Sequence, residues 1–199
     1  MNYGDVKNMY LKKGYKFRTE KMALNIFGIR SKESKSDKFD DLGGVAWINE
    51  NGVPSLMNFW MTTDPGKPGL LQPTRAEGTI IMVPGQYLNV YEKGLHKGEY
   101  DCLKQCSDMH YVRDNNKDSV LDFDLYRNPD NLLKHGFWGN NGTNFHRASA
   151  YTIVNMVSKW SEGCQVVQRP ETFDKIIALR DLSIKFGFLK FYYTLFEEI

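Results

Sequence analysis

The sequence contains few cysteine and histidine residues and no long hydrophobic run. Its three cysteines are an odd number, which argues against a disulfide framework. No apolar stretch approaches the roughly 20 residues of a membrane-spanning helix. The N-terminal stretch MNYGDVKNMYLKKGYKF lacks the apolar segment and the cleavage site of a secretory signal peptide. We therefore expect a protein that is made in a cytosol and is not inserted into a membrane.

The chain also lacks a strong excess of one charge. Its formal net charge is +2 at pH 7, and no Lys/Arg run is interleaved with aromatic residues. We therefore expect no nucleic-acid partner. The 199 residues, of which 41% are hydrophobic, suffice for the core of a single domain.

Hydrophobic periodicity predicts a β-rich α+β domain with a helix near each end. Residues 5–17 form the first expected helix, with Val6, Met9 and Tyr10 on its apolar side. Residues 169–187 form the second, which begins with Thr172 as the cap and ends at Gly187. The other expected features are strands at 23–30, 143–149 and 188–196, a hairpin with its turn at Asn51-Gly52, a second turn at Pro84-Gly85, and loops at 31–41 and 64–74.

One cysteine and one histidine stand in contexts that suit chemistry. Cys164 follows Ser161, Glu162 and Gly163 in KWSEGCQV, and His146 lies eighteen residues upstream in NFHRAS. A cysteine attacks a carbonyl as a thiolate and needs a base to form it. Two adjacent strands would bring His146 beside Cys164 for that purpose. The alternative is an ordinary packed cysteine, and the spacing alone does not decide between the two.

The arrangement His146-x14-Ser161-x-Gly163-Cys164 resembles the signature of the L,D-transpeptidase (YkuD-type) catalytic domain. That signature is a histidine, a gap of fourteen to seventeen residues, and Ser/Thr-His-Gly-Cys. The stretch GTIIMVPGQY is similar to a Pro-Gly hairpin of the same family. The chain from about Asn25 to Phe196 also resembles an uncharacterised group of tailed-phage proteins, through stretches such as GIRSKE, TTDPG and GLHKGEYDCLKQ.

The resemblance implies a β-sandwich or barrel that acts on peptidoglycan stem peptides. In it Cys164 would be the nucleophile, His146 the base, and Ser161 a support for the loop. The backbone N–H groups of Glu162, Gly163 and Cys164 would bind the oxyanion. A thioester acyl-enzyme would be resolved by water or by an amine, and a phage origin favours hydrolysis. Residues 1–35 would pack as a helix-strand element on a catalytic core from about 75 to 199.

Three positions depart from the family pattern. Glu162 stands in place of the family's histidine, Val166 in place of Arg or Asn, and Arg147 in place of a small glycine. These departures leave open a second hypothesis, a catalytically inactive wall-binding or virion structural module on the same fold. A third is an antibacterial effector. In each case the protein would reach the periplasm or cell wall after release or with a virion or delivery partner.

Weaker patterns complete the set of candidate residues. No cofactor is required, but a structural Ca²⁺ could be held by alternating oxygen ligands in RDNNKDSVLDFD, namely Asp114, Asn116, Asp118 and Asp122. A solvated turn rich in Asp and Asn is the alternative. Cys102 and Cys106 are interpreted as structural thiols. Candidate substrate-binding residues are His96, Arg147 and Trp138.

Overall fold

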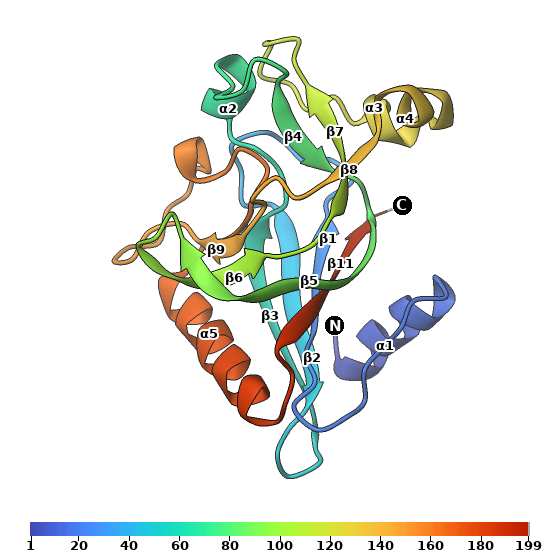
Figure 1. Ribbon diagram of the computed structural model, residues 1–199, viewed down its shortest axis with the longest axis vertical. Coiled ribbons are helices and arrows are strands. Elements are labelled where there is room, and N and C mark those ends of the chain that lie inside the picture. The colour runs from blue at the N-terminus through green and yellow to red at the C-terminus, as the bar shows by residue number, and fades with distance from the viewer. Residues whose placement is uncertain (199) are drawn as a thin grey trace.

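The computed structural model describes residues 1–198, and a closed mixed β-barrel forms its centre (Figure 1). The barrel and a small three-stranded sheet account for all named strands. In hydrogen-bonded order, the barrel strands are β1 (Asn25–Arg30), β11 (Lys190–Glu197), β5 (Gly85–His96), β6 (Tyr100–Gln105), β9 (Phe145–Arg147), β10 (Gln165–Val167), β3 (Pro54–Thr62) and β2 (Asp41–Ile48). The small sheet has the order β4 (Thr79–Met82), β7 (Met109–Asp114) and β8 (Phe137–Gly139).

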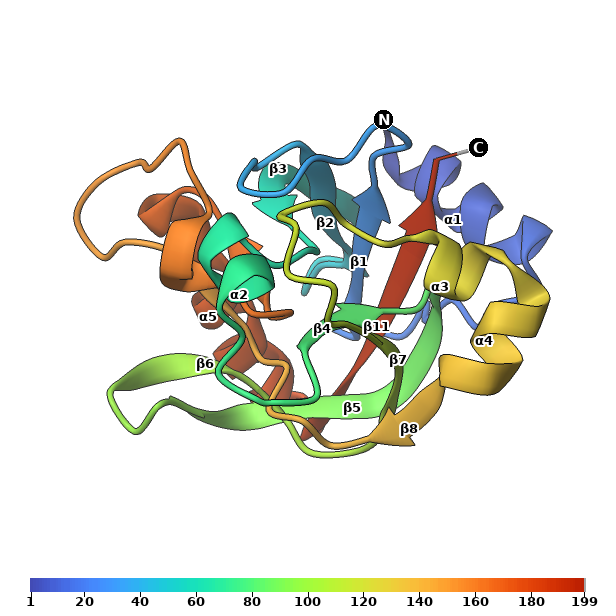
Figure 2. The same ribbon diagram turned by 90° about the horizontal axis from the view of Figure 1, so that it is seen from above.

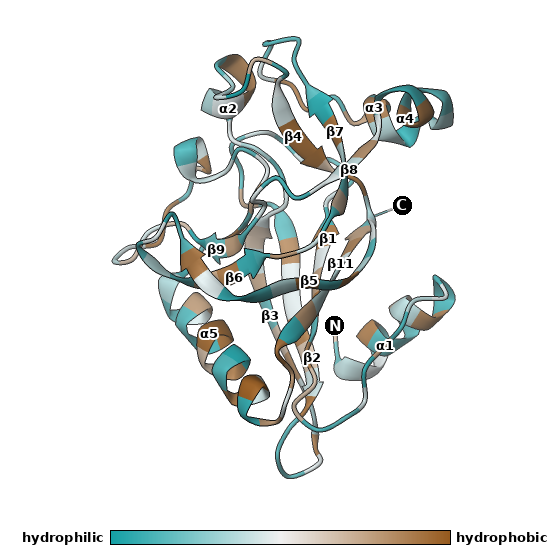
Figure 3. Cartoon of the chain, viewed as in Figure 1, coloured by the Kyte–Doolittle hydropathy of each residue, from teal (hydrophilic) through white to brown (hydrophobic). Residues whose placement is uncertain are grey.

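Two longer helices flank the barrel on opposite sides, as Figures 1 and 2 show. They are α1 (Tyr3–Lys12) and α5 (Pro170–Lys185). In both, hydrophobic and hydrophilic residues alternate along the helix (Figure 3). Short helices lie elsewhere: α2 (Lys67–Leu71), α3 (Asp124–Arg127), α4 (Pro129–His135) and the 3₁₀ helix η1 (Ser158–Trp160). No helix within residues 1–198 is both long and apolar enough to cross a membrane.

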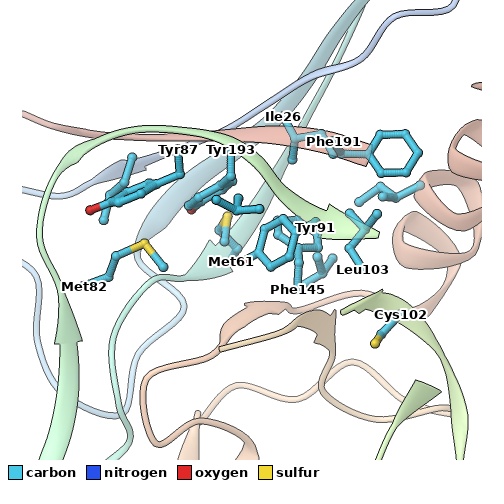
Figure 4. Packing of buried hydrophobic residues seen from close by; sticks show 14 of the residues in the cluster. Ile26, Met61, Met82, Tyr87, Tyr91, Cys102, Leu103, Phe145, Phe191 and Tyr193 are labelled. Atoms are coloured by element: carbon cyan, nitrogen blue, oxygen red, sulfur yellow. The ribbon is translucent and has the colours of Figure 1, made fainter. Parts of the chain in front are cut away.

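Aromatic side chains fill the barrel. Tyr91, Phe145 and Tyr193, from β5, β9 and β11, meet edge to face with ring centroids 5.7–6.4 Å apart (Figure 4). The alternation of strand side chains places Ile26 in this core and Phe27 on the outside, against Tyr10 of α1. Both faces of β1 are therefore buried.

The small sheet shares the barrel core. On β4, Ile80 and Met82 belong to the main cluster of buried residues, whereas Ile81 packs with Phe123 and Tyr126 beside α3. A fully buried arginine joins the two sheets. The guanidinium of Arg30, on β1, donates to the carbonyl oxygen of Met82 at 2.9 Å and pairs with Asp64 at 2.9 Å.

The expected β-rich α+β class is confirmed, as are the two longer helices and the strands near 23–30, 143–149 and 188–196. Helices also occur where none was expected. Within the predicted loop 64–74, Pro68 in the first turn fits a helix start, and α2 forms there. Helices α3 and α4 follow the acidic turn.

Three predicted details are wrong. The hairpin turn is longer than two residues, because Asn49 pairs with Val53 and only Gly52 has positive φ. Pro84-Gly85 is not a hairpin turn, since β4 pairs with β7 while β5 pairs with β11 and β6. Thr172 does not cap α5; Arg169 occupies the N-cap and Pro170 begins the helix.

Candidate active site

Cys164 and His146 lie on neighbouring parallel strands. Cys164 directly precedes β10, and Val166, two residues later, is the register partner of His146 on β9. The Gln165 N–H donates to the Asn144 carbonyl oxygen at 3.0 Å, which fixes Cys164 opposite Asn144. Cys164 is therefore offset from His146 by two residues, about 6–7 Å along the sheet. Their side chains occupy the same face, because residues two apart on a strand point the same way.

The turn before Cys164 requires glycine. Gly163 has φ of 118°, and a Cβ there would lie 2.7 Å from the carbonyl oxygen of Ile80. The buried Ser161 hydroxyl spans this turn: it accepts from the Gly163 N–H at 3.0 Å and donates to the Cys164 carbonyl oxygen at 2.9 Å. Ser161 therefore fixes the backbone on both sides of the glycine.

The Gly163 N–H is consequently not free to bind an oxyanion, contrary to the prediction from the sequence. Its hydrogen goes to Ser161. The N–H groups of Glu162 and Cys164 have no acceptor within residues 1–198. Two of the three predicted oxyanion donors therefore remain.

The carboxylate of Glu162, in the lining of the cleft, is bound by Thr74. It accepts from the Thr74 hydroxyl at 2.7 Å and from the Thr74 backbone N–H at 3.4 Å. Burial is the main cause that raises the pKa of the Cys164 thiol, to about 11; a backbone hydrogen bond from Asn144 and the charge of Lys97 oppose this rise, whereas Glu162 adds to it. The thiol is thus protonated at neutral pH, and it donates to the Gly142 carbonyl oxygen at 3.7 Å.

His146 is buried and oriented by two oxygen atoms. Its Nδ1 lies 2.7 Å from the Arg147 carbonyl oxygen and 3.1 Å from the Tyr100 hydroxyl. A carbonyl only accepts, so Nδ1 carries the proton and Nε2 keeps its lone pair. Nε2 is buried and has no hydrogen-bond partner among residues 1–198. Burial and the neighbouring His96 lower the pKa of His146 to about 3, which leaves the ring neutral.

A second histidine, His96, stacks on the first. The ring centroids of His96 and His146 are 3.9 Å apart and the planes differ by 24°. The side-chain NH₂ of Asn144 donates to His96 Nδ1 at 3.3 Å, because the side-chain Oδ1 of Asn144 accepts from the Gln105 N–H at 2.9 Å. Neutral His96 therefore carries its proton on Nε2. Burial and Lys97 lower the pKa of His96 to about 4.

These groups border a cleft of about 380 Å³ between the barrel and the small sheet. His96 and Cys164 line it, whereas His146 lies behind the lining. One wall is the segment 141–144, which joins β8 to β9. The buried Gln105 side chain holds this segment, since its oxygen accepts from the N–H groups of Asn141 at 3.2 Å and Thr143 at 2.7 Å. The segment is thus anchored in place.

Two predicted substrate-binding residues lie outside this cleft. The Arg147 guanidinium lies 4.0 Å from the centroid of the Tyr100 ring, and Trp138 stacks on His110 with centroids 4.8 Å apart. The sequence analysis missed Tyr100, Asn144 and Lys97. The turn KGE, which directly follows His96 and joins β5 to β6, was the available signal for Lys97 and Tyr100.

The acidic turn is cross-linked by its own side chains. The Asn116 amide nitrogen donates to Asp118 at 3.1 Å and to Asp122 at 2.8 Å, so an N–H donor stands where a cation would need oxygen ligands. Burial raises the pKa of Asp114 to about 6. Over the described part of the chain, no cluster of three or more His, Cys, Asp or Glu residues is arranged to hold a metal ion. Ca²⁺ binding stays a prediction.

The other two cysteines have structural surroundings. Cys102 is fully buried in the core, and Cys106 donates to the Asn89 carbonyl oxygen at 3.3 Å.

Neither protein-family models, nor curated proteins, nor solved structures give a match to this chain.

Proposed function

We propose that the protein is a cysteine peptidase or transpeptidase of L,D-transpeptidase type, which acts on peptidoglycan stem peptides and favours hydrolysis. The observation that carries this proposal is that Cys164, at the cleft, and His146, with an unpartnered Nε2, lie on the same face of neighbouring strands. From the same placement of Cys164 and His146, we propose that the barrel has the L,D-transpeptidase-like fold. A phage-encoded enzyme of this type would degrade the wall.

In the proposed reaction, neutral His146 is the general base. The Cys164 thiol must leave the Gly142 carbonyl oxygen and reach Nε2, which accepts the proton. The thiolate sulfur then attacks the substrate carbonyl carbon. The oxyanion is bound by the N–H groups of Glu162 and Cys164. As the C–N bond breaks, protonated His146 returns the proton to the leaving amine and a thioester remains. Water then hydrolyses the thioester, or an amine attacks it.

Burial keeps His146 neutral but also makes it a weak base toward the Cys164 thiol. With its folded pKa near 3, the imidazole retains the lone pair throughout the neutral range. The Arg147 carbonyl and the Tyr100 hydroxyl, both at Nδ1, stabilise the tautomer in which Nε2 accepts. His96, stacked on the ring, restricts its orientation and separates it from the cleft.

The test is intact-protein mass after incubation with purified muropeptides, together with chromatography of those muropeptides. Wild type should show a transient adduct and shortened or re-joined stem peptides. Cys164→Ala should show neither, while Cys106→Ala, a matched control at another partly exposed thiol, should behave as wild type. Turnover that survives in Cys164→Ala would refute the mechanism.

One observation favours a second candidate, an inactive wall-binding or virion module. The pKa of Cys164 is raised to about 11, and within residues 1–198 no hydrogen bond joins its sulfur to His146 or His96. If wild type forms no adduct, leaves muropeptides unchanged and still sediments with purified cell walls, this candidate replaces the enzyme.

A further inference from the structure

The charged residues that line the cleft beside Cys164 are mostly positive. Four cationic side chains border it: Arg75, Lys97, Arg113 and Lys159. Glu162 is the one carboxylate of the lining, and Thr74 already occupies it. Among residues 1–198, none of the four cations lies within 4.0 Å of a carboxylate oxygen. Their charges are therefore available to a bound molecule.

Arg113 is fixed in orientation by the protein. Its guanidinium donates to the Gly78 carbonyl oxygen at 2.9 Å and to Asn141 Oδ1 at 3.4 Å, and it lies 5.1 Å from the centroid of the Phe137 ring. A guanidinium has five N–H donors, so further donors remain for a ligand. A preoriented guanidinium loses little conformational entropy when it binds a carboxylate.

Lys97 brings a second cation from the barrel. It occupies the turn between β5 and β6 with φ of 51°, directly after His96. Its charge lowers the pKa of the Cys164 thiol and of both histidines, so its field extends to the reacting groups. Arg113 lies on β7 of the small sheet, and the cleft therefore has cations from both of its sheets.

We propose that this cleft is a carboxylate-binding subsite, in which Lys97 and Arg113 bind a free carboxylate of a peptide substrate close to the scissile bond. This inference rests on the proposed function and names the substrate class of the same site. A volume of about 380 Å³ fits a few peptide residues. Apart from His96, Trp160 is the single aromatic side chain of the lining. One such ring does not form a platform on which successive nucleobases could stack, so a peptide is favoured over a single-stranded nucleic acid.

The experiment compares alkylation of Cys164 by iodoacetate and by iodoacetamide, which have nearly the same size and differ in charge. The same thiolate displaces iodide from both reagents, so the ratio of their rates does not depend on the thiol pKa. Peptide mapping separates Cys164 from the other two thiols. The ratio measured for Cys164 in the urea-unfolded protein provides the reference.

We expect the folded wild type to favour iodoacetate over the reference by about two- to five-fold, the effect of a partly solvated ion pair. Lys97→Gln and Arg113→Gln should each reduce this preference, and the double variant should abolish it. Lys175→Gln, at an exposed lysine on α5 outside the cleft, should leave it unchanged. Lys97 is exposed, so its variant stays informative even if Arg113→Gln unfolds.

Three results of the alkylation experiment would overturn the inference: no preference for iodoacetate in wild type, the same preference in Lys97→Gln as in wild type, or no alkylation of Cys164 by either reagent. Alkylation needs no peptide turnover, so it separates this inference from the proposed function. If wild type cleaves a muropeptide and its carboxamide analogue equally well, the enzyme stands and the carboxylate subsite is rejected.

Discussion

The neutral, buried state of His146 predicts how the stability of the protein depends on pH. In the unfolded chain the imidazole titrates near 6.5, whereas in the folded protein its pKa is lowered to about 3. Acid therefore protonates the unfolded state first. The stabilising contribution of His146 is fully present above about pH 6.5 and is lost progressively as the pH falls toward 3.

The size of the effect follows from the two pKa values. At pH 5 the unfolded imidazole is almost fully protonated and the folded one is almost wholly neutral. The pH lies about 1.5 units below the unfolded pKa, and each unit corresponds to about 1.36 kcal/mol, so protonation stabilises the unfolded state by about 2 kcal/mol. For a chain of this length that corresponds to a fall in Tm of about 4–8 °C. Asp41 and Asp114 act in the opposite direction, because burial raises the pKa of each carboxyl.

A comparison with His146→Gln isolates the histidine. Glutamine cannot titrate in this range, and the other groups contribute to both proteins alike. Urea denaturation at pH 7.5 and pH 5 should show that wild type loses about 2 kcal/mol more than the variant. Equal losses, or an NMR titration of the His146 ring proton with a midpoint near 6.5, would refute the assignment of a neutral buried base.

The remaining predictions concern the turn before Cys164 and the buried arginine. Each is a change in the free energy of unfolding, measured by urea denaturation. Ser161→Ala should cost about 1–3 kcal/mol, because it leaves the Gly163 N–H and the Cys164 carbonyl without their shared partner. Gly163→Ala should destabilise more than Gly142→Ala: both residues have positive φ, but only the first would place a Cβ against a backbone oxygen. Equal costs would contradict the packing argument. Arg30→Met should cost about 3–5 kcal/mol, since Asp64 stays buried without its cation; a loss under about 1 kcal/mol would show that Asp64 is protonated instead.

The sequence was sufficient to predict those helices and strands that a local pattern of residues specifies. Helix α5 follows from helical spacing of Phe173 and Ile176 and from its end at Gly187, which has φ of 93°. Strand β11 follows from a run of aromatic and β-branched residues. The thiol–base hypothesis required adjacent strands at His146 and Cys164, and β9 and β10 are neighbours in the barrel.

Contacts between distant segments could not be predicted in the same way. Periodicity identifies β4 and β5 as strands but does not give their partners, and a Pro-Gly pair between them imitates a hairpin turn. The stack of His96 on His146 joins residues fifty apart, and it depends on how β6 pairs with β9. The role of Gln105, which holds one wall of the cleft, likewise depends on its burial.

The parallel pairing of β1 with β11 has a consequence for the order of folding. Asn25 pairs with Tyr192 and Arg30 with Glu197, so the strands that complete the barrel are separated by most of the chain. During synthesis, β1 can pair with β2 early but lacks its other neighbour until residues 190–197 have emerged from the ribosome. Until then one edge of β1 stays open to other strands. We therefore expect closure to be slow and nascent chains to depend on protection from aggregation.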